Sequence, residues 1–369
     1  MHKEFSGVWI MAYTTIDDPS AHFQSFTYTG NGADRTITLP GNSDLKFDLY
    51  WYKQRSQTGH HRMFDTTRGL SLELYPDLTN AESAATYFNN QQANSFDIIA
   101  NDSATNTGDV TFANWQWKAA GGTTTTNTTG NGIDSVIQAN ATAGFSIVTY
   151  TGNGTQSGQT VGHGLGAVPK MIISKDRTNS SNVVSWRVYH VGLGPTKYME
   201  LQSTAAIADY NDWDDTAPTS SVYSVGGAGG YTPTNTNNAL YVAYVFADVQ
   251  GYSKFSSYVS NAVVDGPFVY TGFKPALVMI KNINRAEPWM MYDTKITPTN
   301  PINTVIHANS NSAVSTAAGD YQADFLSNGF KIRVAATGYA NHTVSNTYIY
   351  MAFGEEPLVT STGVPATAR

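Results

Sequence analysis

The chain has 369 residues, of which 13% are charged, 41% are hydrophobic and 12% are aromatic, and its formal net charge is −7. This acidic balance, with no run of Lys or Arg, argues against nucleic acid as a partner, because phosphate binding needs a basic face. The absence of Cys excludes disulfides, thiolate metal sites and a cysteine nucleophile. Abundant Gly, β-branched and aromatic residues are typical of short strands joined by turns, so we predict an all-β fold.

Residues 1–22 precede the first recognisable pattern, and we predict that they form an N-terminal attachment segment. They contain no apolar stretch of the length that a signal peptide needs. No window of the chain approaches the roughly 18 apolar residues of a membrane-spanning helix. We therefore expect a protein made in the cytoplasm, without a signal peptide and without membrane insertion.

The chain repeats itself three times. The phrase Phe-Thr-Tyr-Thr-Gly-Asn-Gly at 26–32 returns almost unchanged at 148–154 and more loosely at 257–261. The period of roughly 110 to 120 residues is that of a small domain, and it is too long for a solenoid repeat. We predict three divergent, tandem β-sandwich domains with a jelly-roll-like fold, followed by a C-terminal tail: copy one at 23–120, copy two at 144–250, copy three at 251–357 and the tail at 358–369.

The connections between the copies differ. Residues 121–143 are rich in Thr, Asn and Gly, a composition that extends readily and packs poorly, and we predict a linker. The join between copies two and three at 248–252 is very short. We expect these two copies to pack as a rigid pair and the three sandwiches to form a rod.

Each copy ends in an aromatic phrase typical of a strand, at 112–117, 241–246 and 348–353. In each phrase one set of alternate positions is apolar and mostly bulky. Alternation of period two places these side chains on one face of a strand. We interpret that face as the core of each sandwich: Ala113, Trp115 and Trp117; Val242, Tyr244 and Phe246; Ile349, Met351 and Phe353.

Two motifs that resemble catalytic or phosphate-binding elements have simpler interpretations. The Gly-Asn-Gly phrases lie between strands and favour hairpin turns, since a phosphate loop needs a helix behind it. His163, in Gly-His-Gly-Leu-Gly, has no Gly-x-Ser-x-Gly elbow to act with, and we predict that it bonds to backbone in a turn. The seven Glu are scattered, so the paired carboxylates of a glycosidase are not indicated and we do not predict an enzyme.

The most unusual local cluster is Asp-Tyr-Asn-Asp-Trp-Asp-Asp at 209–215 in copy two. Four carboxylates within seven residues could ligate Ca²⁺ through oxygen, although the spacing is not that of an EF-hand. We expect no other cofactor. An exposed aromatic ring in the same copy could stack on a sugar face. The candidate residues are Asp209, Asp212, Asp214 and Asp215 for the cation and Trp213 and Tyr231 for a ligand.

The phrases at 144–177, 252–282 and 324–353 resemble a repeat domain of virion structural and tail fibre-like proteins of tailed bacteriophages, mostly marine phages. Copy one is less similar, because it keeps Tyr-Thr-Gly-Asn-Gly but not the His-Gly-Leu-Gly phrase. The resemblance implies a bacteriophage virion protein, and it transfers no catalytic residue to this chain.

From this resemblance we expect a tail fibre or tail-tip adhesin whose loops bind host-surface glycan. A capsid decoration or head-fibre protein is the alternative, because the chain shows no coiled-coil pattern for a fibre shaft. A polysaccharide depolymerase is a second alternative. The expected partners are other virion proteins, host-surface polysaccharide and further copies of the chain, with a trimer as the first expectation since fibres and capsids share threefold symmetry.

Overall fold

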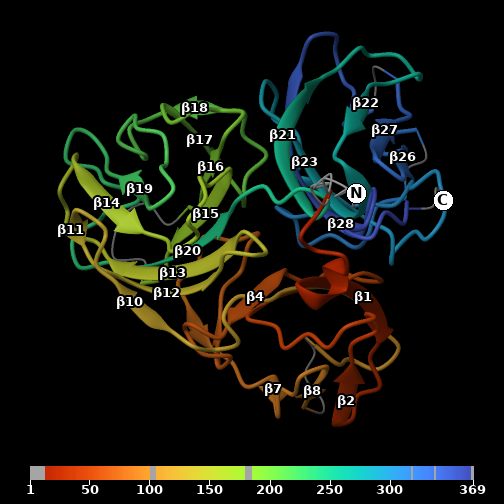
Figure 1. Ribbon diagram of the computed structural model, residues 1–369, viewed down its shortest axis with the longest axis horizontal. Helices are drawn as coiled ribbons and strands as arrows, with labels where there is room; N and C mark the ends of the chain where they lie inside the picture. Colours follow the sequence, from red (N-terminus) through yellow and green to blue (C-terminus); the bar gives the residue numbers. More distant parts are fainter. Residues whose placement is uncertain (1–12, 100–104, 179–184, 317–318, 336–337, 367–369) are drawn as a thin grey trace, which may run out of the picture.

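The computed structural model describes residues 13–99, 105–178, 185–316, 319–335 and 338–366, and shows three lobes around a common centre (Figure 1). The predicted all-β fold is confirmed: the described residues form mostly antiparallel sheets in sandwich-like pairs, with a single 3-10 turn at Pro19–Ala21. No helix in these ranges is long and apolar enough to cross a membrane. Residues 1–12 of the predicted attachment segment and 367–369 of the tail lie outside the described residues.

Copy one forms the lower right lobe of Figure 1. Its four-stranded inner sheet has the order β1-β9-β3-β4, its outer sheet has the order β2-β8-β7, and β5 and β6 pair as a separate two-stranded sheet. The strands are β1 (Phe23–Thr29), β2 (Arg35–Thr38), β3 (Leu49–Gln54), β4 (Arg62–Asp65), β5 (Leu72–Glu73), β6 (Ser83–Ala84), β7 (Phe88–Asn89), β8 (Ser95–Ile98) and β9 (Thr111–Trp117).

Copy two, on the left, extends the same plan to an eight-stranded inner sheet of order β10-β12-β13-β20-β15-β16-β17-β18 and an outer sheet of order β11-β14-β19. The strands are β10 (Thr125–Asn127), β11 (Gly132–Ile133), β12 (Ser135–Asn140), β13 (Phe145–Thr151), β14 (Gln159–Gly162), β15 (Met171–Asp176), β16 (Arg187–His190), β17 (Lys197–Glu200), β18 (Ala208–Asp209), β19 (Val222–Val225) and β20 (Leu240–Phe246).

Copy three, at the upper right, has a five-stranded inner sheet of order β21-β28-β23-β24-β25 and an outer sheet of order β22-β27-β26. The strands are β21 (Ser253–Val259), β22 (Phe268–Tyr270), β23 (Phe273–Asn282), β24 (Met290–Asp293), β25 (Ile306–His307), β26 (Ala323–Leu326), β27 (Gly329–Ile332) and β28 (Thr347–Pro357).

The predicted linker at 121–143 is not a linker. It contributes β10 and β12 to the inner sheet of copy two and β11 to the outer sheet. Ile133 and Ile137 point into the core of copy two, because alternate residues of this segment face inward. A segment rich in Thr and Asn can therefore pack well when its few aliphatic residues keep a period of two.

Each inner sheet buries both of its faces. In β28, Tyr348, Tyr350 and Ala352 enter the core of copy three, whereas the alternate residues enter a second core at the centre of the molecule. The predicted alternating stripes of all three copies, at 113–117, 242–246 and 349–353, meet in this central core. The interpretation of these stripes as the core of each separate sandwich is thus wrong. They join the three sandwiches to one another.

The three copies therefore do not form a rod. The ring of Phe353 in copy three stacks on Phe23 of copy one at 5.0 Å between centroids, and it lies 5.9 Å from Phe246 of copy two. The coupling expected between copies two and three thus extends to copy one. A shared core of this kind removes apolar area of every copy from water at once.

Equivalent buried lysines bond from each copy to the preceding one around the ring. Lys53 Nζ of copy one donates to the carbonyl of Asn311 in copy three at 3.3 Å. Lys175 Nζ of copy two donates to a carbonyl of copy one, and Lys281 Nζ of copy three donates to a carbonyl of copy two. The cycle identifies a pseudo-threefold axis through the central core.

A second cycle of hydrogen bonds between the copies runs in the same direction, one strand further from the central axis. Trp186 Nε1 of copy two donates to the carbonyl of Tyr75 at 2.9 Å, and Trp289 Nε1 of copy three donates to that of Glu200 at 3.0 Å. In copy one, His61 stands at the same place and its Nε2 lies 2.9 Å from the carbonyl of His307. An imidazole thus substitutes for the indole as donor while the bond between copies is kept.

Candidate functional site

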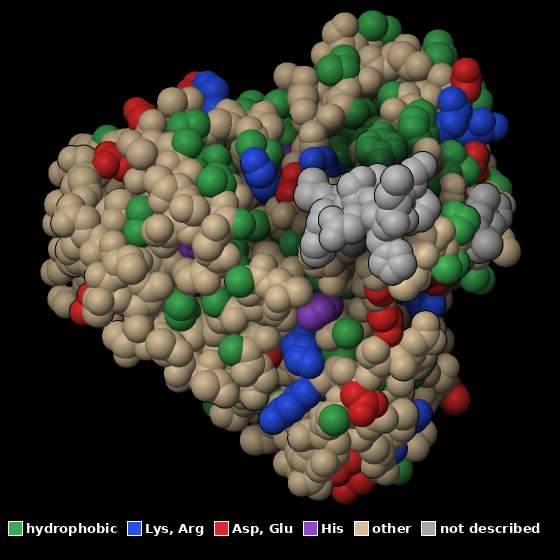
Figure 2. Space-filling model, viewed as in Figure 1, with side chains coloured by type: hydrophobic (Ala, Val, Ile, Leu, Met, Phe, Trp, Pro, Cys, Tyr) green, Lys and Arg blue, Asp and Glu red, His purple; other side chains and the backbone are tan. Residues whose placement is uncertain are grey.

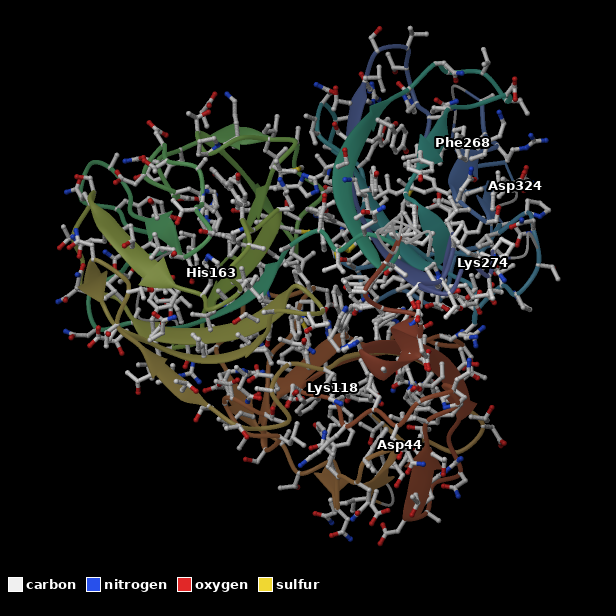
Figure 3. The ribbon with its side chains drawn as sticks, in the orientation of Figure 1. Asp44, Lys118, His163, Phe268, Lys274 and Asp324 are labelled. Atoms are coloured by element: carbon white, nitrogen blue, oxygen red, sulfur yellow. The ribbon has the colours of Figure 1, made fainter. Side chains whose placement is uncertain are left out.

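The outer sheet of copy three carries two exposed aromatic side chains. Phe268 and Tyr270 of β22 are 44% and 54% exposed, and Val269 between them is buried in the core of copy three. Alternation along the strand therefore points both rings away from the protein. Hydrophobic and charged side chains lie side by side on this lobe (Figure 2), and Phe268 and Asp324 are labelled there in Figure 3.

The register of the outer sheet defines the surroundings of these rings. Phe268 lies opposite Lys331 of β27, which lies opposite Asp324 of β26, so the three form one row across the sheet. Residues directly opposite in an antiparallel pair point to the same face. In the next row, Tyr270 lies opposite Gly329, and a Cβ at Gly329 would overlap the backbone of β22. We call Phe268, Tyr270, Lys331 and Asp324 the aromatic platform.

Charges on this face occur as neighbouring pairs. Lys331 Nζ is 2.7 Å from Asp265 Oδ1, and Arg333 Nε is 3.5 Å from Asp324 Oδ2. The hydrogen bond from Lys331 holds the pKa of Asp265 below its ordinary value. At neutral pH the face therefore carries both signs of charge beside an apolar surface.

The ring of Tyr270 is held in place by the segment before copy one. Tyr13 donates its hydroxyl to the carbonyl of Gly272 at 2.7 Å, and its oxygen lies 3.1 Å from the hydroxyl of Tyr270. Because the Tyr13 proton is used on Gly272, the Tyr270 hydroxyl is the donor between the two rings. A ring fixed in this way loses less conformational entropy when a ligand binds.

Copies one and two show no such platform among their described residues. The exposed side chains of β2 in copy one are Thr36 and Thr38. In copy two the positions that match Phe268 and Tyr270 are Thr160 and Gly162, and residues 127–133 lie against them. A Cβ at Gly162 would overlap the side chain of Asn127, and β11 pairs along the edge of β14 beside Thr160. The aromatic pair is therefore not required by the repeated fold.

The four aspartates predicted to bind a cation do not converge. Asp209 forms an ion pair with Lys197, and Asp212 is buried 3.5 Å from Arg187 Nε. Asp214 Oδ2 accepts from the backbone N–H of Gly158 at 2.7 Å. Asp214 and Asp215 lie next to each other with positive φ. In the ranges that the structure describes, no group of three or more His, Asp and Glu side chains could hold a metal ion.

Trp213 does not offer a stacking surface. Its side chain is 1% exposed and packs edge-on against Tyr189 in the core of copy two, with centroids 5.8 Å apart. The expectation of an exposed ring at Trp213 is wrong. A large indole inside a short acidic loop anchors that loop to the sandwich by burying its apolar surface.

Tyr231 is half-buried and belongs to a cage around a buried arginine. Arg187 Nη2 donates to the Tyr231 hydroxyl at 3.0 Å, and the guanidinium stacks on Tyr198 with 4.0 Å between Cζ and the ring centroid. Burial raises the pKa of Asp212 beside it to about 6, against the opposing effect of Arg187. Copy one has a related cage in which Arg62 lies over Tyr75 and Tyr87, so this arrangement serves the fold.

His163 has the structural role that its sequence context predicts. Its Nε2 lies 3.2 Å from the carbonyl of Thr219, and its Nδ1 accepts from the N–H of Leu165 at 3.2 Å. Burial lowers the pKa of the imidazole, so it is neutral at pH 7. Both imidazole nitrogens are thus hydrogen-bonded to the backbone. Figure 3 shows His163 within the left lobe.

A cavity of about 270 Å³ lies between copies one and three. Its charged lining includes Lys295, whose Nζ is 3.1 Å from Glu355 Oε1, and Asp18. Among its described lining residues no aromatic ring is exposed. Lys295 and the two glutamates of the lining belong to ion pairs, and Asp18 accepts hydrogen bonds from the Ser20 N–H and the Ser43 hydroxyl. The aromatic platform is therefore the better candidate for ligand contact.

The sequence contains a signal for the platform that motif reading does not use. Phe268 and Tyr270 belong to a phrase that resembles its counterpart in copy two, so a search for motifs assigns them to the repeated fold and not to a site. Only position-by-position comparison shows aromatic residues where copy two has Thr160 and Gly162. A site is expected where copies differ, and this is such a place.

Comparison with known proteins supports treating the three copies as one unit. No curated protein matches the chain. One family model, described as "Domain of unknown function (DUF7483)", matches residues 18–357 without a break between the copies. The match covers all three sandwiches and the central core that they share, and the chain belongs to the DUF7483 family.

Proposed function

We propose that this protein is a non-enzymatic structural component of a bacteriophage particle and that it contacts host-surface glycan through the aromatic platform of copy three. The observation that carries the proposal is the outward pair Phe268 and Tyr270, at positions where the other two copies have small or covered residues. Exposed aromatic rings beside polar groups are typical of ligand-contacting surfaces. The resemblance of copies two and three to phage virion repeat domains supports the proposal that the protein belongs to a phage particle.

The test compares binding of purified chains to immobilised bacterial surface polysaccharides. We expect saturable binding by the unmodified protein and at least a tenfold loss in the double variant Phe268→Ala/Tyr270→Ala, since two anchors at about 1 kcal/mol or more each are removed. The matched control is Thr36→Ala/Thr38→Ala, which changes the exposed residues of the outer sheet in copy one. Equal binding by all three proteins would contradict the proposal, as would the absence of binding to every polysaccharide.

A capsid decoration protein is the second candidate, and the pseudo-threefold arrangement favours it. One chain supplies three similar lobes around one axis, a shape that suits a threefold position of a capsid without requiring three chains. Immunogold labelling of intact particles with antibody to residues 145–356 separates the two. Gold on the tail supports host contact, whereas gold spread over the head supports decoration and contradicts the adhesin proposal.

A further inference from the structure

We infer that the ligand of the aromatic platform is a neutral glycan, whose hydroxyl groups are bound by Asp324 and Lys331 while its ring stacks on Phe268. This inference rests on the proposed function and specifies its ligand class. The row of these three residues runs straight across the outer sheet. Neighbouring strands are about 4.8 Å apart, so the row spans about 10 Å, which suits a sugar ring with its edge hydroxyls.

The ring at one end of the row supplies the stacking surface. Phe268 is 44% exposed and is the row's one apolar side chain. Lys331 is next to it and keeps a quarter of its side chain exposed. An ammonium group has three N–H donors, so Lys331 can donate to a hydroxyl while it remains 2.7 Å from Asp265. A sugar lying over Phe268 therefore meets a donor at its edge.

Asp324 supplies the acceptor at the other end. Its Oδ2 is 3.5 Å from Arg333 Nε, whereas a good charge-assisted hydrogen bond is about 2.8 Å long. The loose ion pair leaves the carboxylate with acceptor capacity for O–H donors. Vicinal hydroxyls of a sugar can thus bond to carboxylate and ammonium groups on neighbouring strands.

The charge balance of the face argues against an acidic glycan. Lys331 and Arg333 are each paired with a carboxylate, Asp265 and Asp324 respectively, so the four charges sum to zero. A uronate would have to approach both carboxylates, one of which is 84% exposed. The chain as a whole carries −7, which also repels a polyanion.

The experiment measures binding of the full chain to two neutral polysaccharides, laminarin and mannan, and two acidic ones, alginate and polygalacturonate. We expect binding to at least one neutral polymer that changes less than twofold between about 0.05 and 0.5 M NaCl, because no net charge is neutralised. Asp324→Ala should weaken that binding about tenfold and, by leaving Arg333 unpaired, should strengthen binding to alginate. Asp44→Ala, an exposed acidic position of copy one labelled in Figure 3, is the control and should change neither.

The results distinguish a failure of the neutral-glycan inference from a failure of the glycan-binding proposal. Preferential, salt-sensitive binding to the acidic polymers that still depends on Phe268 and Tyr270 would overturn the neutral-glycan inference and leave the glycan proposal standing. Equal binding of a neutral polymer by the unmodified protein and by Asp324→Ala would also overturn the inference, because Asp324 would then not bind the sugar hydroxyls. Binding that is unaffected by the Phe268→Ala/Tyr270→Ala variant, or no binding to any of the four polymers, would overturn both.

Discussion

The buried ammonium group of Lys281 in copy three donates a hydrogen bond to the carbonyl of Thr204 in copy two, with 3.1 Å between Nζ and the carbonyl oxygen. The same bond recurs from Lys53 and from Lys175, each to the preceding copy around the ring. A buried ammonium is costly unless hydrogen bonds compensate it. That all three copies keep a lysine here indicates that these bonds help to hold the copies in register around the axis.

The first prediction concerns the central core. Phe353→Ala removes a ring that contacts Phe23, Trp117 and Phe246, and it should destabilise the whole protein by about 3–5 kcal/mol. Because one core joins the copies, calorimetry should show a single transition for both proteins, with a lower Tm in the variant. Val344→Ala, at a position 62% exposed, is the control and should leave the Tm nearly unchanged. Separate transitions for the copies would contradict this account.

The second prediction concerns pH. Burial lowers the pKa of Lys53, Lys175 and Lys281 to about 8, against 10.5 for an exposed lysine. Between these values the unfolded chain binds more protons than the folded one, so the free energy of unfolding rises with pH. The cost of the buried charge is fully present below pH 8 and fades as the pH rises. We expect the Tm to increase from pH 8 to 9.5.

The matching variant is Lys281→Met. It removes the donor to the carbonyls of Thr204 and Asn282 together with the cost of the buried charge, so its stability relative to the unmodified protein should fall as the pH rises from 8 to 9.5. It should also reduce the pH-dependent rise by about one third, since one of three equivalent lysines is gone. Lys254→Met, at a side chain 38% exposed, should preserve the rise. An unchanged rise in Lys281→Met would show that the lysines do not carry the effect.

The third prediction concerns the positioning of Tyr270. Tyr13→Phe removes the hydroxyl that bonds to Gly272 and Tyr270 and leaves the ring in place. We expect glycan binding about two- to threefold weaker, with a change in unfolding free energy of about 1 kcal/mol or less. Tyr210→Phe, which removes a similar hydroxyl in copy two, is the control. If both variants bind as the unmodified protein does, Tyr13 has no part in the site.

The fourth prediction concerns residues 121–143. Strands β10 and β12 pair with the inner sheet of copy two, so limited digestion with proteinase K should not cut within 125–140. Ile137→Asp places a charge in the core of copy two and should expose this segment to cleavage. Val136→Asp, on the outward side of the same strand, is the control and should remain resistant. Rapid cleavage of the unmodified chain in this range would restore the linker interpretation.

The candidate site illustrates why exposure is hard to read from a sequence. Trp213 and Phe268 are both aromatic residues in segments rich in polar residues and turns, yet one is buried and the other is 44% exposed. Trp213 is covered because Tyr189, 24 residues earlier in the chain, packs against it. Phe268 remains open because copy three has no segment equivalent to 127–133 in the described part of the chain. Local pattern cannot distinguish the two cases.

Strand content, the number of copies and the alternation that assigns side chains to two faces of each strand can be predicted from the amino-acid sequence. These follow from composition, repetition and period-two patterning, which are local properties. Which of these faces pack against each other depends on the three-dimensional arrangement of the copies. From the sequence, the alternating residues at 349–353 could pack within copy three or outside it. Phe353 lies in the central core because it contacts Phe23 and Phe246, which are distant in the chain. Burial depends on partners distant in sequence, so the central core and the open platform emerge only once the three copies are placed around one axis.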